Sequence, residues 1–328
     1  MTNLSKCVIL YVSTNNGGFM TNYNLGYACI NKGFSERPKK QRITTNRSMI
    51  KRTFKEKGLP YASELALLNC KDLLTIMKWN KKNNINFFRM SSDLIPWASD
   101  YELTQLPDYE AIAEVLYEVG LYVAENNIRI TTHPGPFNKL TSPKENVVLN
   151  TIRDLEIHGE IFDLMCLPRT PYAKINIHVG AAYDNKPMAI DNFCKNFQRL
   201  SQAVQTRLTV ENDDKPSLYT TKELYDDIFK RINIPVVFDY HHHDLHSGGI
   251  EEREALDMAL ATWPVGIRPV VHYSESRSDE YDDPKIKPQA HSDSYIRPVN
   301  TYGLPMDIML EAKHKEQALF KMRQLMEE

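Results

Sequence analysis

The stretch Ile234 to His246 reads IPVVFDYHHHDLH, an apolar run that ends in an aspartate and continues directly into a group of histidines. The residues after Pro235 are typical of a short buried strand, so Asp239 and the histidines should lie where that strand stops. The same form recurs, because IRITTH ends at His133, KINIHV contains His178, RLTVE ends at Glu211, RPVVHYSE carries His272 and Glu275, and DIMLE ends at Glu311. Polar residues at the ends of six strands predict that these side chains converge on one site.

Eight strand-like segments begin near residues 25, 85, 128, 174, 207, 235, 267 and 307, and helix-patterned segments separate nearly all of them. Strict alternation of this kind predicts parallel strands joined by right-handed crossovers. Eight units favour an α/β fold with a single closed (β/α)8 TIM barrel over an open sheet, and no Gly-rich nucleotide-binding motif follows any strand. Catalytic groups of such barrels lie at the C-terminal strand ends, where we expect the metal site.

Length and composition indicate one compact domain. Of the 328 residues, 42 % are hydrophobic and 25 % are charged, and no apolar run reaches the length of a membrane span or a secretory signal. We predict an N-terminal extension over 1–24 and one barrel domain over 25–328. The five cysteines are scattered without a CxxC pair, which argues against a disulfide framework and favours an intracellular protein of the cytoplasm or nucleus.

Helical periodicity predicts covering helices over 62–80, 108–127, 142–165, 190–205, 221–231, 251–262 and 314–326. Ser142 is the expected N-cap of the third of these helices, with Pro143 at its first position. His158 and His314 fall on helix patterns, so we interpret both as structural or surface residues.

The segment between Lys32 and Lys57 contains ten Lys and Arg residues against two glutamates, which is a local charge of +8 in a chain whose net charge is -2. A patch of this kind is typical of a surface that contacts a phosphate backbone. A solvated loop and helix surface is the plainer alternative.

The predicted strand-end cluster has the chemistry of a metal centre. Imidazole and carboxylate together suit Mn²⁺, Zn²⁺ or Fe²⁺ better than Ca²⁺ or Mg²⁺. The set exceeds the three or four ligands of one zinc, so two or three divalent ions are expected. Ions about 4 Å apart can activate water and stabilise both oxygens of a phosphoryl displacement. Together with the basic stretch, this predicts phosphodiester hydrolysis.

Individual members of the cluster have different expected roles. Glu211 should bridge two ions, although TVEND could instead be a helix-start cluster. Asp239 and His242, spaced D-x-x-H, can coordinate one ion from a tight turn, whereas the HHH run as a whole could be an exposed loop and need not all take part.

Several motifs follow one another in a recognisable order, namely LGYACIN, FRMSSDLIPWAS, THPG, NIHVG, TVEND, FDYHHH, VHYSES, AHSD and DIMLEAKHKEQAL. From about Leu25 to the C-terminus the chain resembles the UV damage endonuclease family, a relative of the endonuclease IV-like TIM barrels. The resemblance implies two or three divalent ions, most often Mn²⁺ with Zn²⁺ as the alternative. It also implies ATP-independent incision of duplex DNA 5′ of pyrimidine dimers and 6-4 photoproducts, with abasic sites as a further substrate.

The resemblance also assigns roles to residues. Glu211 and His272 are the expected catalytic residues. The implied metal ligands are His133, His178, Glu211, Asp239, His242, His272, His291 and Glu311. The expected DNA and lesion contacts are Tyr27 and Asn31, which fall where the family inserts residues opposite the damage, Pro136 and Phe137 after THPG, and the cations Lys39, Lys40 and Arg42.

Three positions depart from the family pattern. Asp100 stands where the family usually has a histidine ligand, and a carboxylate there could still coordinate and would favour manganese over zinc. Val270 replaces a lysine often found two residues before His272, so any role of that lysine must be absent or supplied otherwise. Pro136 and Phe137 replace the usual Gln and Tyr; Phe137 can still stack, whereas Pro136 offers no amide.

Two further functions remain open from the sequence. The first is a two-metal sugar isomerase or epimerase on the same barrel, which would not need the basic stretch. The second is a lesion-binding protein that has lost catalysis through the changes at Asp100 and Val270. For the favoured reading the partner is damaged double-stranded DNA, with no membrane, no nucleotide cofactor and a monomeric state.

Overall fold

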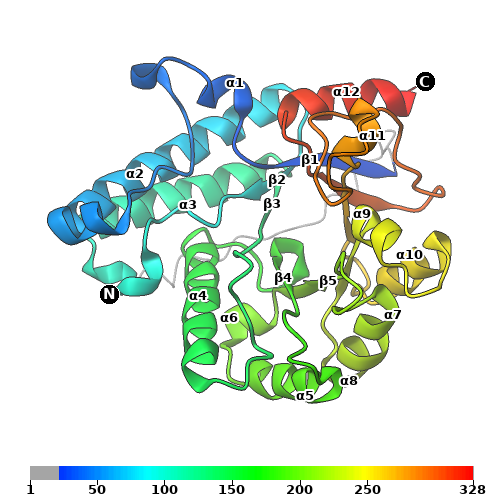
Figure 1. Cartoon of the computed structure of the whole chain (residues 1–328). Helices are drawn as coiled ribbons and strands as arrows, with labels where there is room; N and C mark the ends of the chain where they lie inside the picture. The colour runs from blue at the N-terminus through cyan, green and yellow to red at the C-terminus, as the bar shows by residue number, and fades with distance from the viewer. Residues whose placement is uncertain (1–21, 328) are drawn as a thin grey trace.

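The computed structural model describes residues 22–327, and its eight strands close into a barrel in chain order, with each strand parallel to its neighbours (Figure 1). The strands are β1 (Tyr23–Cys29), β2 (Phe87–Met90), β3 (Arg129–Thr132), β4 (Ile175–His178), β5 (Leu208–Glu211), β6 (Val236–Asp239), β7 (Val270–Tyr273) and β8 (Met306–Leu310). Pairing of β1 with β8 completes the closure. The predicted TIM barrel is therefore confirmed.

The N-terminal boundary differs slightly from the prediction. β1 begins at Tyr23, two residues inside the predicted extension, because Tyr23 already pairs with Met306 of β8. The rest of the predicted extension, residues 1–21, lies outside the described residues.

Helices surround the barrel and connect its strands (Figure 1). They are α1 (Lys32–Ser35), α2 (Lys51–Lys82), α3 (Tyr109–Glu125), α4 (Glu145–Leu164), α5 (Lys186–Phe197), α6 (Gln202–Gln205), α7 (Thr221–Glu223), α8 (Lys230–Ile232), α9 (Tyr240–Leu245), α10 (Glu252–Leu260), α11 (Arg277–Tyr281) and α12 (Glu316–Glu327). Shorter turns are η2 (Lys39–Gln41), η3 (Ala98–Asp100), η4 (Leu103–Gln105) and η5 (Pro171–Ala173), and the π-helical η6 (Leu224–Phe229) joins α7 to α8.

Helix boundaries depart from the prediction where local hydrogen bonds compete. α4 begins at Glu145 rather than near Ser142, because the Ser142 hydroxyl accepts the Lys144 N–H at 3.1 Å and forms a separate turn before the helix. α2 begins eleven residues before the predicted helix, and Gly58, with φ of 63°, breaks it internally. The segment predicted as one helix over 190–205 is divided into α5 and α6.

The N-terminal end of the barrel is closed by a buried charge pair. Arg129, the first residue of β3, places its Nη1 atom 2.8 Å from Asp307 Oδ2 of β8 and also donates to backbone carbonyls. Its guanidinium stacks near the rings of Tyr172 and Trp263. Because this end is packed and internally satisfied, the polar residues at the opposite, C-terminal end form the accessible mouth.

Among the described residues, Cys29, Cys70 and Cys194 are free thiols. Within the described part of the chain, no helix combines the length and apolar character needed to cross a membrane.

Candidate metal centre

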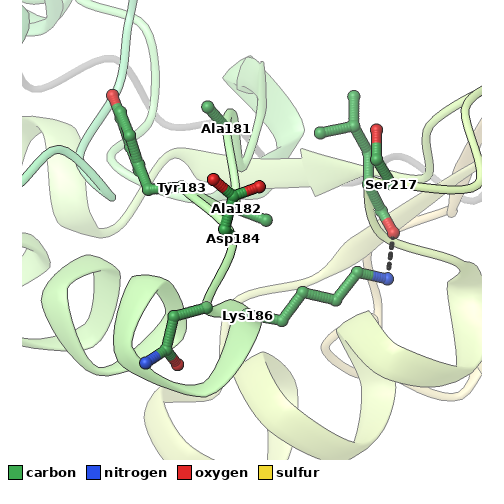
Figure 2. Close-up of a pocket in the computed structure, with 8 residues that line it drawn as sticks. Ala181, Ala182, Tyr183, Asp184, Lys186 and Ser217 are labelled. Atoms are coloured by element: carbon green, nitrogen blue, oxygen red, sulfur yellow. Dashed lines mark hydrogen bonds between the residues drawn. The ribbon is translucent and has the colours of Figure 1, made fainter.

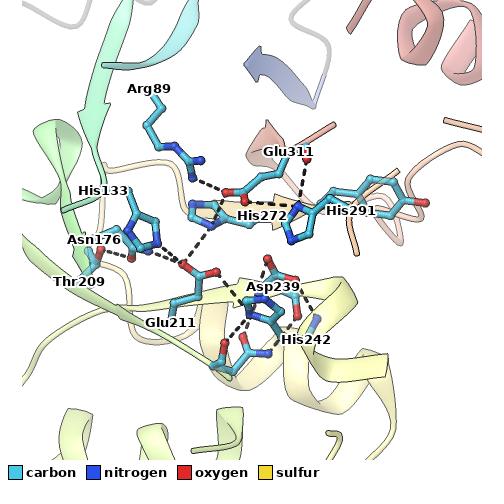
Figure 3. Close-up of polar contacts among 12 residues, drawn as sticks. Arg89, His133, Asn176, Thr209, Glu211, Asp239, His242, His272, His291 and Glu311 are labelled. Carbon is cyan, nitrogen blue, oxygen red and sulfur yellow. Dashed lines mark hydrogen bonds and ion pairs between the residues drawn. The ribbon is translucent and has the colours of Figure 1, made fainter. Parts of the chain in front are cut away.

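Strand register places the predicted side chains next to one another. In the barrel, His178 at the end of β4 is paired with Glu211 at the end of β5, and Asp239 at the end of β6 is paired with His272 in β7. His133 directly follows β3 and contacts Glu211 from the far side of β4. Figure 3 shows His133, Glu211, Asp239 and His272 directed towards one another from the C-terminal ends of their strands.

Glu211 is the centre of this arrangement. Its Oε2 atom lies 3.1 Å from His133 Nε2 and 3.0 Å from His272 Nδ1, whereas its Oε1 atom lies 3.6 Å from His242 Nδ1. Two groups could each hold a metal ion, one made by His133, Glu211 and His272, the other by His178, Glu211 and His242. Because Glu211 belongs to both groups, its carboxylate has the geometry of a bridging ligand.

Glu311 extends the centre towards the loop that follows β7. Its Oε1 atom lies 3.2 Å from His272 Nδ1, and its carboxylate is ion-paired with Arg89. Its backbone carbonyl accepts a hydrogen bond from His291 Nδ1 at 3.0 Å, while the Glu311 Oε2 atom is 3.9 Å from that nitrogen. His291, distant in sequence from any strand end, is thereby placed beside the centre (Figure 3).

Asp239 and His242 form the expected tight turn. The Oδ1 atom of Asp239 accepts the His242 N–H at 2.9 Å at the start of α9. The Oδ2 atom is buried and has no hydrogen-bond partner among the described residues. A buried carboxylate oxygen without a partner is costly, and a cation would satisfy it. The donor set therefore fits divalent ions that accept both imidazole and carboxylate.

Burial and charge set the protonation of these groups. Burial lowers the pKa of His133 and lowers that of His272 to about 4, so both imidazoles are neutral and available as ligands at pH 7. Although burial opposes ionisation of Glu211, the neighbouring His272 and His178 hold its pKa well below the usual range. Burial also raises the pKa of Asp239 to about 7.

His178 behaves differently from the other imidazoles. Burial alone would lower its pKa, but Glu211 and a hydrogen bond with Asp213 outweigh burial and raise the pKa to about 10. In the metal-free protein this ring therefore carries a proton at pH 7. Binding a metal through His178 requires that proton to leave.

In four of these histidines the ring nitrogen Nδ1 has a close oxygen partner. Partners of this kind fix the orientation of a metal-binding imidazole. The pairs are His133 Nδ1 with the Pro134 carbonyl at 3.1 Å, His178 Nδ1 with Asp213 Oδ1 at 3.0 Å, His242 Nδ1 with the Asn212 carbonyl at 2.8 Å, and His291 Nδ1 with the Glu311 carbonyl at 3.0 Å.

Sequence reasoning missed several polar residues that support the centre. Asn176 donates to Glu211 Oε2 and accepts from the Thr209 hydroxyl, and Arg89 pairs with Glu311. A signal was present, because Asn176 stands two positions before His178 and Thr209 two positions before Glu211. Alternate residues of a strand point to the same side, so polar residues at this spacing share the barrel interior with the strand-end residues.

Glu275 does not join the centre, although its position after β7 suggested that it would. It is 1 % exposed, and its carboxylate accepts the Ile296 N–H at 2.9 Å and the Tyr273 hydroxyl at 3.0 Å. Its oxygens thus anchor the loop that returns to β8. Two residues beyond the strand end, the chain has already turned away from the barrel axis.

The structure gives the positions of Asp100 and Val270, two of the departures from the family pattern. Asp100 is exposed in η3 and belongs to neither three-residue group, so we omit it from the proposed ligand set. Val270 is fully buried in β7. The amine near His272 comes instead from Lys174, the residue before β4.

Tyr27 and Asn31 are buried, contrary to their expected insertion into DNA. Tyr27 is 0 % exposed, its hydroxyl donates to Asn80 Oδ1 at 2.8 Å, and its ring packs edge-on against Phe88. Asn31 is 1 % exposed and caps α1 by accepting the Phe34 N–H. Both side chains are committed to the fold, which leaves them no surface for a duplex.

The remaining expected DNA contacts are exposed. Phe137 is 85 % exposed and follows the exposed Pro136 in the loop after β3. Lys39, Lys40 and Arg42 are exposed in and after η2, and within residues 22–327 they form no ion pair.

The HHH run is not an exposed loop, so that alternative is wrong. It forms α9, in which His241 and His243 are each 4 % exposed. His158 is likewise buried in α4, which agrees with a structural role.

A pocket of about 380 Å³ lies apart from these ligands, on the loops after β4 and β5 (Figure 2). It is lined by residues 181–186 and by Ser217 and Leu218. Lys186 crosses it to donate to the Leu218 carbonyl and to Glu223. None of the proposed metal ligands lines this pocket, so we assign it no part in the chemistry.

Comparison with known proteins gives a consistent result. The chain is 36 % identical over 311 residues to the UV-damage endonuclease of Schizosaccharomyces pombe, covering 91 % of this chain and 50 % of that protein. It is also 36 % identical over 264 residues to a UV DNA damage endonuclease of Bacillus cereus, covering 77 % of this chain and 79 % of the relative. The chain thus spans about half the length of the fission yeast protein.

Solved structures agree in fold. The crystal structure of SacUVDE superposes with a TM-score of 0.79 at 29 % identity, covering 93 % of this chain and 98 % of that one. A D-tagatose 3-epimerase-like protein matches with a TM-score of 0.51 at 12 % identity over 76 % of this chain and 90 % of the other, which shows a shared barrel fold alone. The family model described as UV-endonuclease UvdE matches residues 23–328. Because this family model matches nearly all of the described residues, the chain belongs to the UvdE family of UV endonucleases.

Proposed function

We propose that this chain is a metal-dependent DNA repair endonuclease that nicks damaged duplex DNA 5′ of UV photoproducts, including pyrimidine dimers and 6-4 photoproducts, and that also acts at abasic sites. The observation that supports this most is the shared position of Glu211 between two candidate metal groups. Membership of the UvdE family adds independent support.

The residues that would hold the ions are His133, His178, Glu211, Asp239, His242, His272, His291 and Glu311. Mn²⁺ is the proposed occupant and Zn²⁺ the alternative, since the set mixes imidazole with carboxylate. When bound, two or three such ions would supply positive charge that activates a water and stabilises the attacking and leaving oxygens of a phosphodiester.

The chain's own groups prepare this site. Neutral His133 and His272 offer lone pairs without first losing a proton, because burial lowers the pKa of both. Asn176 holds Glu211 Oε2 on one side, so the carboxylate keeps both oxygens directed at the imidazoles. We assign Glu211 and His272 the central catalytic positions for this reason.

The proposed DNA path runs over the same face of the barrel. The exposed cations Lys39, Lys40 and Arg42 follow β1 and would contact phosphates, as expected for a basic stretch. Exposed Phe137 follows β3 and would stack against an unpaired base. Pro136 would shape that loop. Lys222 and Lys230 are both ion-paired to Asp226. Their replacement by alanine is therefore the control for replacing Lys39, Lys40 and Arg42, and it should leave DNA affinity unchanged.

A sugar isomerase or epimerase remains the second candidate, because the barrel fold is shared with epimerase-like proteins. The free cations after β1 favour the nuclease, since a small sugar gives them nothing to bind. A binding protein without catalysis is disfavoured, because both three-residue groups assemble without Asp100 or a lysine at 270.

One assay separates the candidates. Purified protein and Mn²⁺ are incubated with a duplex that carries one defined photoproduct, and the products are separated on a denaturing gel. A cut adjacent to the lesion supports the endonuclease, whereas binding without a cut supports the non-catalytic alternative. Absence of binding together with interconversion of ketose and aldose would support the isomerase. We expect a monomeric, intracellular protein, which gel filtration and cell fractionation can test.

A further inference from the structure

Lys174 is a fully buried lysine beneath the candidate metal centre. It directly precedes β4, is 0 % exposed, and its Nζ atom lies 3.2 Å from His272 Nε2. Within the described residues, Nζ has no other hydrogen-bond partner. Burying a lysine amine costs desolvation free energy, so a fully buried lysine needs interactions that offset this cost.

The ring of His272 differs from the other proposed histidine ligands in the partner of its second nitrogen. His133, His178, His242 and His291 each place Nδ1 against an oxygen atom. His272 directs its Nδ1 atom at Glu211 and Glu311, and its Nε2 atom meets the amine of Lys174 instead of an oxygen.

We propose that Lys174 is a positioning residue, which fixes the ring of His272 so that Nδ1 faces the metal centre. The inference rests on the proposed metal centre and deepens it by naming the residue that organises the group formed by His133, Glu211 and His272. Contacts with the ring nitrogen opposite a metal restrict the rotation of an imidazole and preorganise it for binding.

Glu211 and Glu311 lie beside His272, and Arg89 pairs with Glu311 from β2. Burial disfavours the charged form of the Lys174 amine and lowers its pKa well below the usual range, although both glutamates raise it. The positioning role therefore depends on the contact between Lys174 Nζ and His272 Nε2 and not on a charge pair.

The inference makes a selective prediction, because Lys174 contacts His272 and not the second group. His178 and His242 have their own oxygen partners. Loss of the amine should weaken metal binding at the group that contains His272 by about 10- to 100-fold, the range for residues that orient a ligand. Binding at the group that contains His178 and His242 should change much less.

The test uses Lys174→Met, which keeps length and removes the amine, and Lys174→Gln, which restores a hydrogen-bonding group. Lys186→Met is the matched control, since Lys186 is ion-paired to Glu223 at 2.7 Å and contacts no proposed ligand. Mn²⁺ binding is titrated by calorimetry without DNA, and thermal unfolding is measured on the metal-free proteins.

We expect Lys174→Met to lower one Mn²⁺ affinity while its metal-free unfolding temperature stays at or above that of the wild type, because a buried amine has been removed. Lys174→Gln should recover part of the affinity, and Lys186→Met should bind Mn²⁺ like the wild type. If wild type and Lys174→Met bind Mn²⁺ equally, or if Lys174→Met loses stability and both affinities together, the positioning role is wrong. If the wild type itself binds no Mn²⁺, the proposed metal centre is wrong, and the role of Lys174 is wrong with it.

Discussion

Replacing Glu211 by glutamine tests the bridging position most directly. The substitution keeps the size of the side chain and removes one negative charge. Since Oε2 faces His133 and His272 while Oε1 faces His242, the change affects both candidate metal groups at once.

The magnitude follows from that geometry. Loss of a residue that merely orients a ligand costs about 10- to 100-fold in metal affinity, so loss of a shared ligand should cost about 100-fold or more at each group. A factor of 100 corresponds to about 2.7 kcal/mol. The metal-free protein should lose only about 1–3 kcal/mol, because Asn176 can still donate to the remaining amide oxygen.

Three measurements check this expectation. Calorimetry with Mn²⁺ reports metal affinity, thermal unfolding reports the metal-free fold, and the denaturing gel reports incision of a defined photoproduct. Incision should be abolished, while binding of damaged DNA should be largely kept because the exposed cations after β1 are untouched.

Glu275→Gln is the matched control. Glu275 is as deeply buried as Glu211 and lies two residues after β7, but it accepts hydrogen bonds from loop backbone and a tyrosine hydroxyl and contacts no imidazole of the centre. It should lower stability with little effect on metal affinity. If the two variants weaken Mn²⁺ binding equally, or if Glu211→Gln weakens one site and spares the other, Glu211 is not a bridging ligand.

Three further predictions concern the DNA face and the protonation of the centre. Changing Lys39, Lys40 and Arg42 to Ala should weaken intact and damaged duplexes alike and reduce the slope of log K against log salt by about 0.9 per lost contact; an unchanged slope removes them from the interface. Phe137→Ala should leave unfolding unchanged but lower affinity for damaged DNA by about 5- to 150-fold, the equivalent of about 1–3 kcal/mol of stacking; equal loss for intact duplex would argue against a lesion contact. The raised pKa values of His178, about 10, and Asp239, about 7, mean that the metal-free fold holds protons that the unfolded chain releases. This contribution to folding stability is present at low pH and is lost as the pH rises through those values. Because Mn²⁺ displaces the same protons, its binding at pH 7 should release roughly one to two protons and should tighten as the pH rises. Calorimetry in buffers of different ionisation heat measures the number of protons released.

Local sequence patterns determined the architecture and most of the proposed ligands. Each barrel strand is a short apolar run whose period and flanking residues are set within a few positions, so all eight strands could be predicted from neighbouring residues. Parallel strands end on the same face, and that rule alone brings His133, His178, Glu211 and Asp239 to one mouth.

Other features depended on contacts between segments far apart in the chain. Tyr27 and Asn31 follow a family motif, yet closure of the barrel buries both against α2 and α1. Glu275 lies just after β7 as Glu211 lies at the end of β5, but the Ile296 N–H of the returning loop donates a hydrogen bond to the Glu275 carboxylate.

Tertiary structure alone also decided which atoms meet inside the barrel. Lys174 and His272 are 98 positions apart, and nothing in either strand indicates that an amine will meet that imidazole. Strand periodicity specifies the side of the sheet on which a residue lies. It does not specify which side chain fills the shared interior, because that depends on the combined register and packing of all eight strands.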